Sequence, residues 1–136
     1  MKGRADVSWT SALNNPHGID AVYQGSPPEL NGVHVHEVTL HQDGPTLKLR
    51  FDLPIYPTKP PWKWVAQGFN TVQVEISFSG VRDITLNGFG TNIVADVSLT
   101  KKNDITVAVT SPESRLKASS DFAFISQLAA YANDPT

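Results

Sequence analysis

Cysteine is absent from the 136-residue chain, which excludes disulfide bonds, thiol catalysis and cysteine-based metal sites. Long apolar runs are also absent, and no segment approaches the roughly 18 residues that a membrane-spanning helix needs. No apolar stretch follows the two cations near the start of the sequence, as it would in a secretion signal. We therefore expect a cytoplasmic protein without membrane association.

The chain also has little excess charge of either sign. Its 11 lysines and arginines and 13 aspartates and glutamates give a net charge of −2, which provides no basic patch for nucleic acid. Hydrophobic residues make up 40% and charged residues 18%, which indicates a globular chain. The length predicts a single domain over residues 1–136. From the patterns described below we expect this domain to be β-rich, with a helical or irregular segment over 1–28 and a β core over 33–131.

Alternating polarity is the strongest pattern that is present. In residues 46–53, leucine and phenylalanine alternate with polar residues, and residues 71–79 repeat the pattern with valine, isoleucine and phenylalanine. Because successive side chains of a strand point to opposite faces, each segment predicts a strand with one buried face. Similar segments at intervals of about ten residues predict an antiparallel sandwich or strongly curled sheet of about seven strands.

The segments 33–42 and 46–53 predict a hairpin around an Asp-Gly-Pro turn. Within the first segment, the apolar residues change from one face to the other between Val35 and Val38. This change of phase indicates a bulge, or a strand that is partly buried on both sides.

The N-terminal segment predicts short helices. Ser8 can cap a turn that carries Trp9, and the spacing of Ile19 and Val22 predicts a second short helix that ends at Gly25.

The C-terminal segment predicts another strand over residues 115–124, with Phe122 and Phe124 among its inward side chains. Residues 125–131 fit both helical and strand spacing, and we favour a strand.

Residues 54–64 combine four prolines with Trp62 and Trp64. The proline spacing is typical of polyproline II ligands, but its position between two strands favours a rigid connection within the fold. The strand-like spacing of the two tryptophans predicts that both face one way. We expect one of them in the core and the other as an exposed anchor, because tryptophan is enriched at binding hot spots.

Two histidines, His34 and His36, share one face of a predicted strand and are the candidates for a metal site. Such a site needs a third ligand, for which His17 and His41 are the other imidazoles. The alternative, a pair of histidines on a solvated sheet face, is the one we favour. We therefore predict no metal and no cofactor.

The sequence contains no strong candidate for a catalytic site. Glu75 and Asp96 could form a pair of catalytic carboxylates if their strands were neighbours, but a solvated face with cross-strand charge pairs is favoured. No serine lies in a Gly-x-Ser-x-Gly elbow, and no phosphate-binding loop is present. We predict that the protein is not an enzyme.

A series of turn and core residues is spread over most of the chain: Trp9, residues 33–46, residues 47–54, Pro60-Pro61, Lys63-Trp64, residues 70–75, residues 80–84, Leu86, Gly88 and Tyr131. The order of these features resembles the immunity protein 50 family of bacterial polymorphic toxin systems.

The resemblance implies a small antidote that binds a cognate toxin and blocks it, and it supplies no catalytic residues. If so, we expect the contact on one sheet face and its adjacent loops, at Trp62, Phe89, Glu75, Asp83 and Asp96. Two alternatives remain open. One is a β-module that binds a small molecule or carbohydrate by stacking on a tryptophan. The other is a hydrolase that uses the histidine pair or the carboxylate pair.

Overall fold

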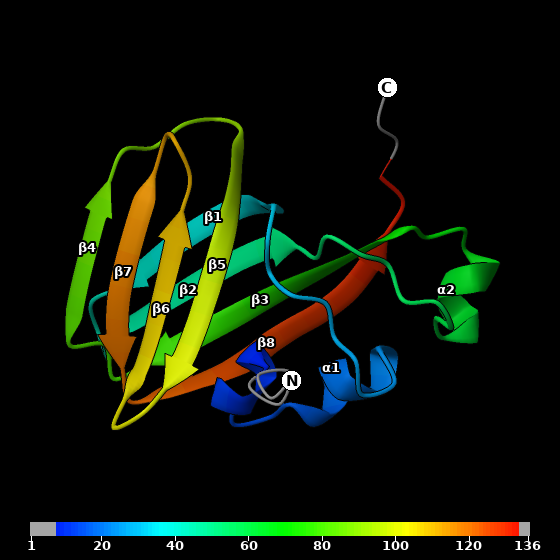
Figure 1. Cartoon of the computed structure of the whole chain (residues 1–136), viewed down its shortest axis with the longest axis horizontal. Coiled ribbons are helices and arrows are strands. Elements are labelled where there is room, and N and C mark those ends of the chain that lie inside the picture. Colours follow the sequence, from blue (N-terminus) through cyan, green and yellow to red (C-terminus); the bar gives the residue numbers. More distant parts are fainter. Residues whose placement is uncertain (1–7, 134–136) are drawn as a thin grey trace, which may run out of the picture.

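Eight antiparallel strands dominate the computed structural model, which describes residues 8–133 (Figure 1). The order of the strands in the sheet is β4-β7-β6-β5-β1-β2-β3-β8. Their bounds are β1 (Val33–His41), β2 (Thr46–Asp52), β3 (Thr71–Ser79), β4 (Asp83–Asn87), β5 (Ile93–Lys101), β6 (Ile105–Thr110), β7 (Arg115–Ser120) and β8 (Phe122–Tyr131).

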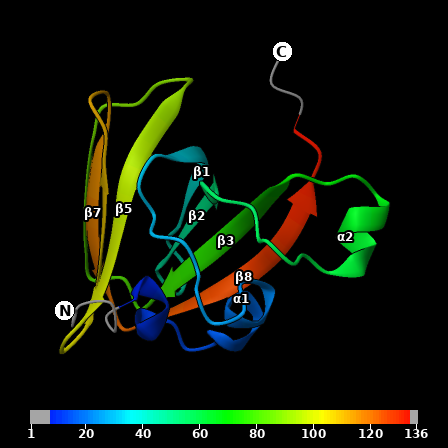
Figure 2. The ribbon, with the colours of Figure 1, turned by 45° about the vertical axis from the view of Figure 1, so that its right-hand side comes forward.

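The sheet is single and open, so the expectation of a sandwich or a strongly curled sheet is wrong. Its two halves, β1-β2-β3-β8 (the β1 half) and β4-β7-β6-β5 (the β5 half), meet where residues 33–35 of β1 pair with residues 93–95 of β5. Figure 2 shows that the strands of the two halves run in clearly different directions. Alternating polarity predicts strands but not their partners, and this short junction has no signature in the sequence.

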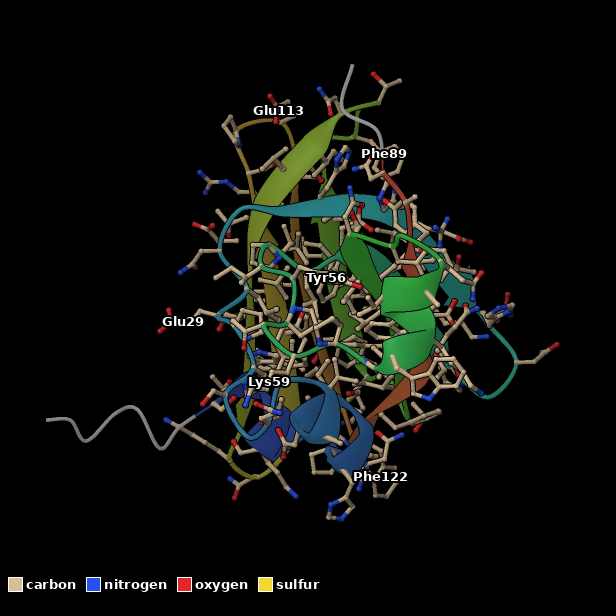
Figure 3. All side chains as sticks on the ribbon, turned by 90° about the vertical axis from the view of Figure 1, so that its right-hand side faces the viewer. Glu29, Tyr56, Lys59, Phe89, Glu113 and Phe122 are labelled. Atoms are coloured by element: carbon tan, nitrogen blue, oxygen red, sulfur yellow. The ribbon has the colours of Figure 1, made fainter. Side chains whose placement is uncertain are left out.

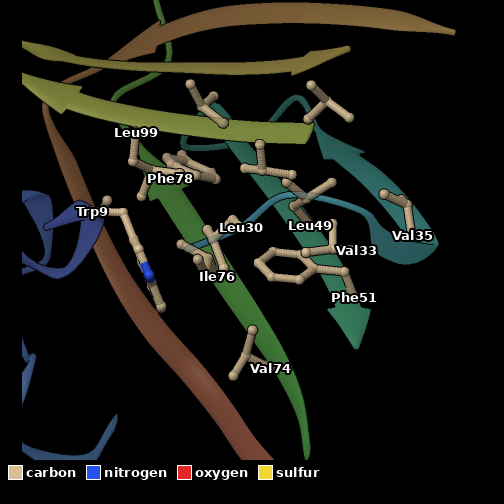
Figure 4. Close-up of a cluster of buried hydrophobic side chains, with 14 of the residues drawn as sticks. Trp9, Leu30, Val33, Val35, Leu49, Phe51, Val74, Ile76, Phe78 and Leu99 are labelled. Carbon is tan, nitrogen blue, oxygen red and sulfur yellow. The ribbon is translucent and has the colours of Figure 1, made fainter. Parts of the chain in front are cut away.

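The hydrophobic core gathers side chains from both halves, as Figure 4 shows. Phe51 of β2 and Phe78 of β3 are fully buried, and Leu99 of β5 belongs to the same cluster. Each large side chain of this kind contributes roughly 1.5–3 kcal/mol by leaving water. The alternating polarity of these strands therefore predicts the buried face correctly.

The predicted β1–β2 hairpin is confirmed, and so is the bulge in β1. The pairing register shifts between Val35 and Glu37, and Val38 then lies opposite Leu49 on the core side. The extra residue is His36. Because of the bulge, the apolar residues before and after it face the same core although their spacing in the sequence changes phase.

The N-terminal segment forms the two short helices that the sequence predicts. The 3-10 helix η2 (Trp9–Ala12) is capped by Ser8, and α1 (His17–Val22) follows. Asn14 and Asn15 bind the backbone of β8 at Ala123 and Ile125, 109 and 110 residues further along the chain. This segment is thereby fixed along the edge strand of the β1 half. No helix among the described residues is long and apolar enough to cross a membrane.

The C-terminal segment contains two strands where the sequence predicts one over residues 115–124. The chain turns at Asp121, whose carboxylate forms an ion pair with Arg82, and β8 begins at the next residue. The turn shifts the phase by one residue, so that Ala123 is buried while Phe122 and Phe124 are exposed. The prediction that these two phenylalanines point inward is therefore wrong, whereas the predicted strand over 125–131 is confirmed.

The tryptophan pair lies in a helix, α2 (Trp62–Ala66), and the expected strand-like arrangement is wrong. Residues two apart on a helix point in nearly opposite directions. Trp62 is accordingly 75% exposed, whereas Trp64 packs against the core beside Tyr56, with the ring centroids 6.3 Å apart. The expected exposed tryptophan is therefore Trp62, whereas Trp64 is partly buried against the core and not within it.

Candidate functional site

A polar cluster lies on the face of the β1 half that points away from the core. Its centre is Asp52, which is only 6% exposed. One carboxylate oxygen, Oδ2, lies 2.9 Å from His36 Nε2 and accepts a 2.6 Å hydrogen bond from the Tyr131 hydroxyl. The other, Oδ1, accepts a 3.0 Å hydrogen bond from Gln73 Nε2. His34 stacks on His36 with the ring centroids 4.7 Å apart. We call these five residues the Asp52 cluster.

Strand pairing brings the cluster together. Asp52 lies between His34 of β1 and Gln73 of β3 in the register, so their side chains stand next to one another on one face. The bulge in β1 gives both His36 and Glu37 access to this face. Tyr131 is the last residue of β8, and its hydroxyl reaches the cluster.

The negative charge of the cluster lies on the Asp52 carboxylate. Burial alone would raise the pKa of the Asp52 carboxyl, but the hydrogen bonds with His36, Tyr131 and Gln73 together outweigh burial and lower the pKa. Burial and the contact with this carboxylate raise the pKa of Tyr131 to about 12. The cluster therefore contains an ionised Asp52 and a protonated Tyr131 around neutral pH.

Arg50 connects the cluster to the charged surface beside it. Its guanidinium donates a 3.0 Å hydrogen bond to Gln73 Oε1 and forms a 2.9 Å ion pair with Glu37. A hydrogen bond from the Thr39 hydroxyl and the contact with Arg50 lower the pKa of the Glu37 carboxyl. Polar contacts thus run without a break from Thr39 to Asp52 across β1, β2 and β3.

A groove of about 240 Å³ opens beside the two histidines. One side is formed by His34, His36 and Glu37, and the other by the loop between β4 and β5, including Phe89. Phe89 is 68% exposed, and Figure 3 shows it at the end of the molecule where Glu113 also lies, opposite the end that carries Phe122. The groove therefore combines imidazoles, a carboxylate and an exposed aromatic ring.

Of the five residues that the sequence predicts for binding, Phe89 lines this groove. Glu75 lies on the same outer face of the β1 half, opposite Arg50 in the register, and accepts a 2.8 Å hydrogen bond from the Ser126 hydroxyl. Phe89 and Glu75 therefore belong to one surface, which consists of the groove and the outer face of the β1 half.

The other three lie elsewhere. Trp62 is on α2, Asp83 begins β4, and Asp96 of β5 accepts a 2.9 Å hydrogen bond from the Gly32 backbone. Five strands separate β4 from β3 in the sheet, so Asp83 is far from Glu75 in strand order. The structure does not bring all five residues into one cluster.

The candidate carboxylate pair is not assembled. Glu75 of β3 and Asp96 of β5 belong to strands that have β1 and β2 between them. The condition for a catalytic pair, neighbouring strands, is not met, and the geometry of a glycosidase site is missing at these two residues.

For the histidine pair, the structure places a third group with a possible ligand atom, the Asp52 carboxylate, close by. Within residues 8–133, His34, His36 and Asp52 form the group with possible metal-ligand atoms close together, all within 4.8 Å of one another. Neither His17 nor His41 belongs to it. Sequence reasoning places Asp52 on the polar face of its strand but misses its burial and its partners, because Gln73 and Tyr131 come from distant strands.

Comparison with known proteins identifies the family. The model of the family described as Immunity protein 50 matches residues 15–131. The chain belongs to the immunity protein 50 family. This agrees with the resemblance seen in the sequence, and the match includes the whole sheet, the groove and the Asp52 cluster. No curated protein and no solved structure matches this immunity protein 50 member.

Proposed function

We propose that this protein neutralises a cognate toxin by binding it, without catalysing a reaction itself. The observation that carries the proposal is the match to the immunity protein 50 family over residues 15–131. The outer face of the β1 half, together with the groove at Phe89, is the proposed contact surface.

The chemistry of this surface supports the proposal. Phe89 presents an exposed aromatic ring beside the groove, and aromatic residues surrounded by polar groups are typical of binding hot spots. The charged side chains of Glu37, Arg50 and Glu75 stand on the adjoining strands. They supply both signs of charge, which favours a partner with a matching pattern. A standard interface needs about 800 Å² on each partner, so it would extend beyond the groove over this sheet face.

Phe89 and Glu75 are the members of the predicted interface that fit this surface. Trp62, Asp83 and Asp96 lie outside this surface and would be contacts only of a partner centred on α2 or on the β5 half. Substituting them one at a time therefore distinguishes a contact centred on the groove from one centred on α2 or on the β5 half.

Membership of the family implies that the cognate toxin is encoded beside this protein, so the test is protection against the product of a neighbouring toxin gene. Cells that express this toxin should survive when the full-length protein is co-expressed, and the two proteins should co-purify as a complex. F89S should weaken the complex at least tenfold, because a truncated hot spot typically costs more than about 1.4 kcal/mol. W62S is the matched control, since it removes an exposed aromatic ring outside the groove.

Two outcomes decide the matter. Absence of binding and of protection by the wild-type protein contradicts the proposed function. Protection that is lost in W62S and kept in F89S supports the function and moves the contact surface to α2.

A second candidate function, binding of a small molecule or carbohydrate, rests on Trp62. Its indole is 75% exposed and offers a ring face for stacking, whereas Trp64 is packed against the core. A sugar that binds here should raise the melting temperature of the wild-type protein and leave that of W62S unchanged. No shift with any member of a sugar panel argues against this candidate.

A further inference from the structure

We propose that His34, His36 and Asp52 form a binding site for a divalent transition-metal ion, with Zn²⁺ as the best match. The inference goes beyond the proposed function, because the site is defined by the chain's own residues and needs no toxin.

The ligand set has the composition and spacing that zinc prefers. Two imidazoles and one carboxylate provide three ligand atoms that lie within 4.8 Å of one another. Bonds of about 2.0–2.2 Å to a tetrahedral Zn²⁺ require ligand atoms about 3.3 Å apart. The 2.9 Å separation of His36 Nε2 and Asp52 Oδ2 is shorter than this, and the 4.8 Å limit for the group is longer, so the imidazoles must reorient to close around an ion.

The carboxylate is held in place before any ion binds. Hydrogen bonds from Gln73 and Tyr131 fix Asp52, and Arg50 in turn fixes Gln73. Carboxylate ligands of metal sites are commonly oriented by outer hydrogen bonds of this kind. The Asp52 side chain is 9% exposed, so it cannot turn freely into solvent.

His34 places a second imidazole beside the contact between His36 and Asp52. Its ring stacks on His36 with an interplanar angle of 12°, and because an imidazole binds a metal in its own ring plane, one ring must turn before both coordinate the same ion. Within residues 8–133, the hydrogen bonds of the structure include none to the His34 ring. Its ring nitrogens are therefore available for coordination.

The groove gives an ion access. His34 and His36 both line it, so water or another small ligand can complete a four-coordinate shell from that side. Three protein ligands with one open position are the arrangement of zinc sites that bind an exchangeable ligand.

The experiment is a calorimetric titration of Zn²⁺ into the tag-free full chain after treatment with a chelator. One ion should bind per chain, and excess Zn²⁺ should raise the melting temperature. Replacing Zn²⁺ with Co²⁺ should give the visible absorption of a low-coordinate nitrogen- and oxygen-ligated ion. A wild-type protein that shows no saturable binding overturns the proposal.

Variants assign the ligands. H34A should weaken Zn²⁺ binding at least tenfold and keep the fold, because it removes no hydrogen bond found within the described residues. H41A, on the same strand but outside the group, should bind as the wild type does. Q73A should weaken binding about tenfold, as expected for a residue that orients a ligand.

D52N provides a second test of the ligand set, since it keeps the shape of the side chain and removes its charge. Its melting temperature should no longer rise with Zn²⁺. Unchanged affinity in H34A, or an equal loss of affinity in H41A, overturns the assignment.

Discussion

The hydroxyl of Tyr131 donates a 2.6 Å hydrogen bond to Oδ2 of Asp52, which joins the end of β8 to the end of β2 across 79 residues of sequence. Because β3 lies between these two strands, the bond spans β3 and helps to hold the edge strand β8 in place.

Replacing this tyrosine should therefore destabilise the fold. Y131F removes a donor to a nearly buried carboxylate, and we expect a loss of about 1–2 kcal/mol in the free energy of unfolding. Urea denaturation measures the change, and an unaltered midpoint would show that the bond makes no net contribution. Mutation of an exposed residue at the same edge, F122S, is the control, because surface substitutions typically stay within about 0.5 kcal/mol.

Two further tyrosines form a matched pair with opposite expectations. The Tyr23 hydroxyl donates a 2.6 Å hydrogen bond to the backbone oxygen of Ile55, whereas the Tyr56 hydroxyl is buried without a partner among the described protein atoms. Y23F should cost about 1 kcal/mol, and Y56F should leave the protein as stable or stabilise it by up to about 1 kcal/mol. Chemical denaturation of both variants decides, and a destabilised Y56F would contradict the assignment of its hydroxyl as unsatisfied.

The raised pKa of Tyr23 should also make the stability of the fold depend on pH in the alkaline range. Burial, with a smaller contribution from nearby Tyr56, raises the pKa of Tyr23 far above its ordinary value of 10.0. Above pH 10 the unfolded chain releases this proton while the folded chain keeps it, so the free energy of unfolding falls as pH rises. The stability that Tyr23 contributes is complete below pH 10 and is lost above it.

Denaturation curves at pH 8, 9, 10 and 11 test this expectation. Y23F should lose less stability than the wild type between pH 10 and 11, and the gap between the two proteins should narrow. A gap that widens over this range has the wrong sign for a tyrosine with a raised pKa.

Gly88 precedes the groove residue Phe89 and has a φ of 78°. A Cβ atom at this position would collide with the backbone oxygen of Glu113, whereas one at Gly44, whose φ is 58°, would meet nothing within 4 Å. Both alanine variants carry the strain of a left-handed backbone, of order 1–3 kcal/mol, but G88A adds a steric clash. G88A should thus be the less stable of the two by thermal denaturation, and equal melting temperatures would argue against the close approach.

Local patterns in the sequence predict the strands well because burial alternates within each of them. The phase change between Val35 and Val38 even predicts the bulge at His36. The pattern fails where it is short or interrupted: Trp62 and Trp64 have the spacing of a strand but lie in a five-residue helix that follows Pro61. Phe122 and Phe124 have the right spacing too, but the turn at Asp121 reverses their direction.

The candidate site is less predictable than the strands. The two histidines stand out in the sequence, and the polar face of β2 can be predicted, but two hydrogen-bond partners of Asp52, Tyr131 and Gln73, come from other strands. These residues meet only after β1, β2, β3 and β8 have paired, and no local rule specifies which strands become neighbours. Glu75 and Asp96 illustrate the same point. The sequence allows their strands to be neighbours, but two other strands lie between them in the sheet.

The position of β8 at the edge of the β1 half also has a consequence for biosynthesis. The ribosome makes β8 after the other seven strands, yet β8 completes the pairing of β3, receives the asparagines of the N-terminal segment and supplies Tyr131 to Asp52. Until it emerges, the outer edge of β3 has unpaired backbone groups that can associate with other chains. The Asp52 cluster can therefore form only after β8 has been synthesised and has paired with β3.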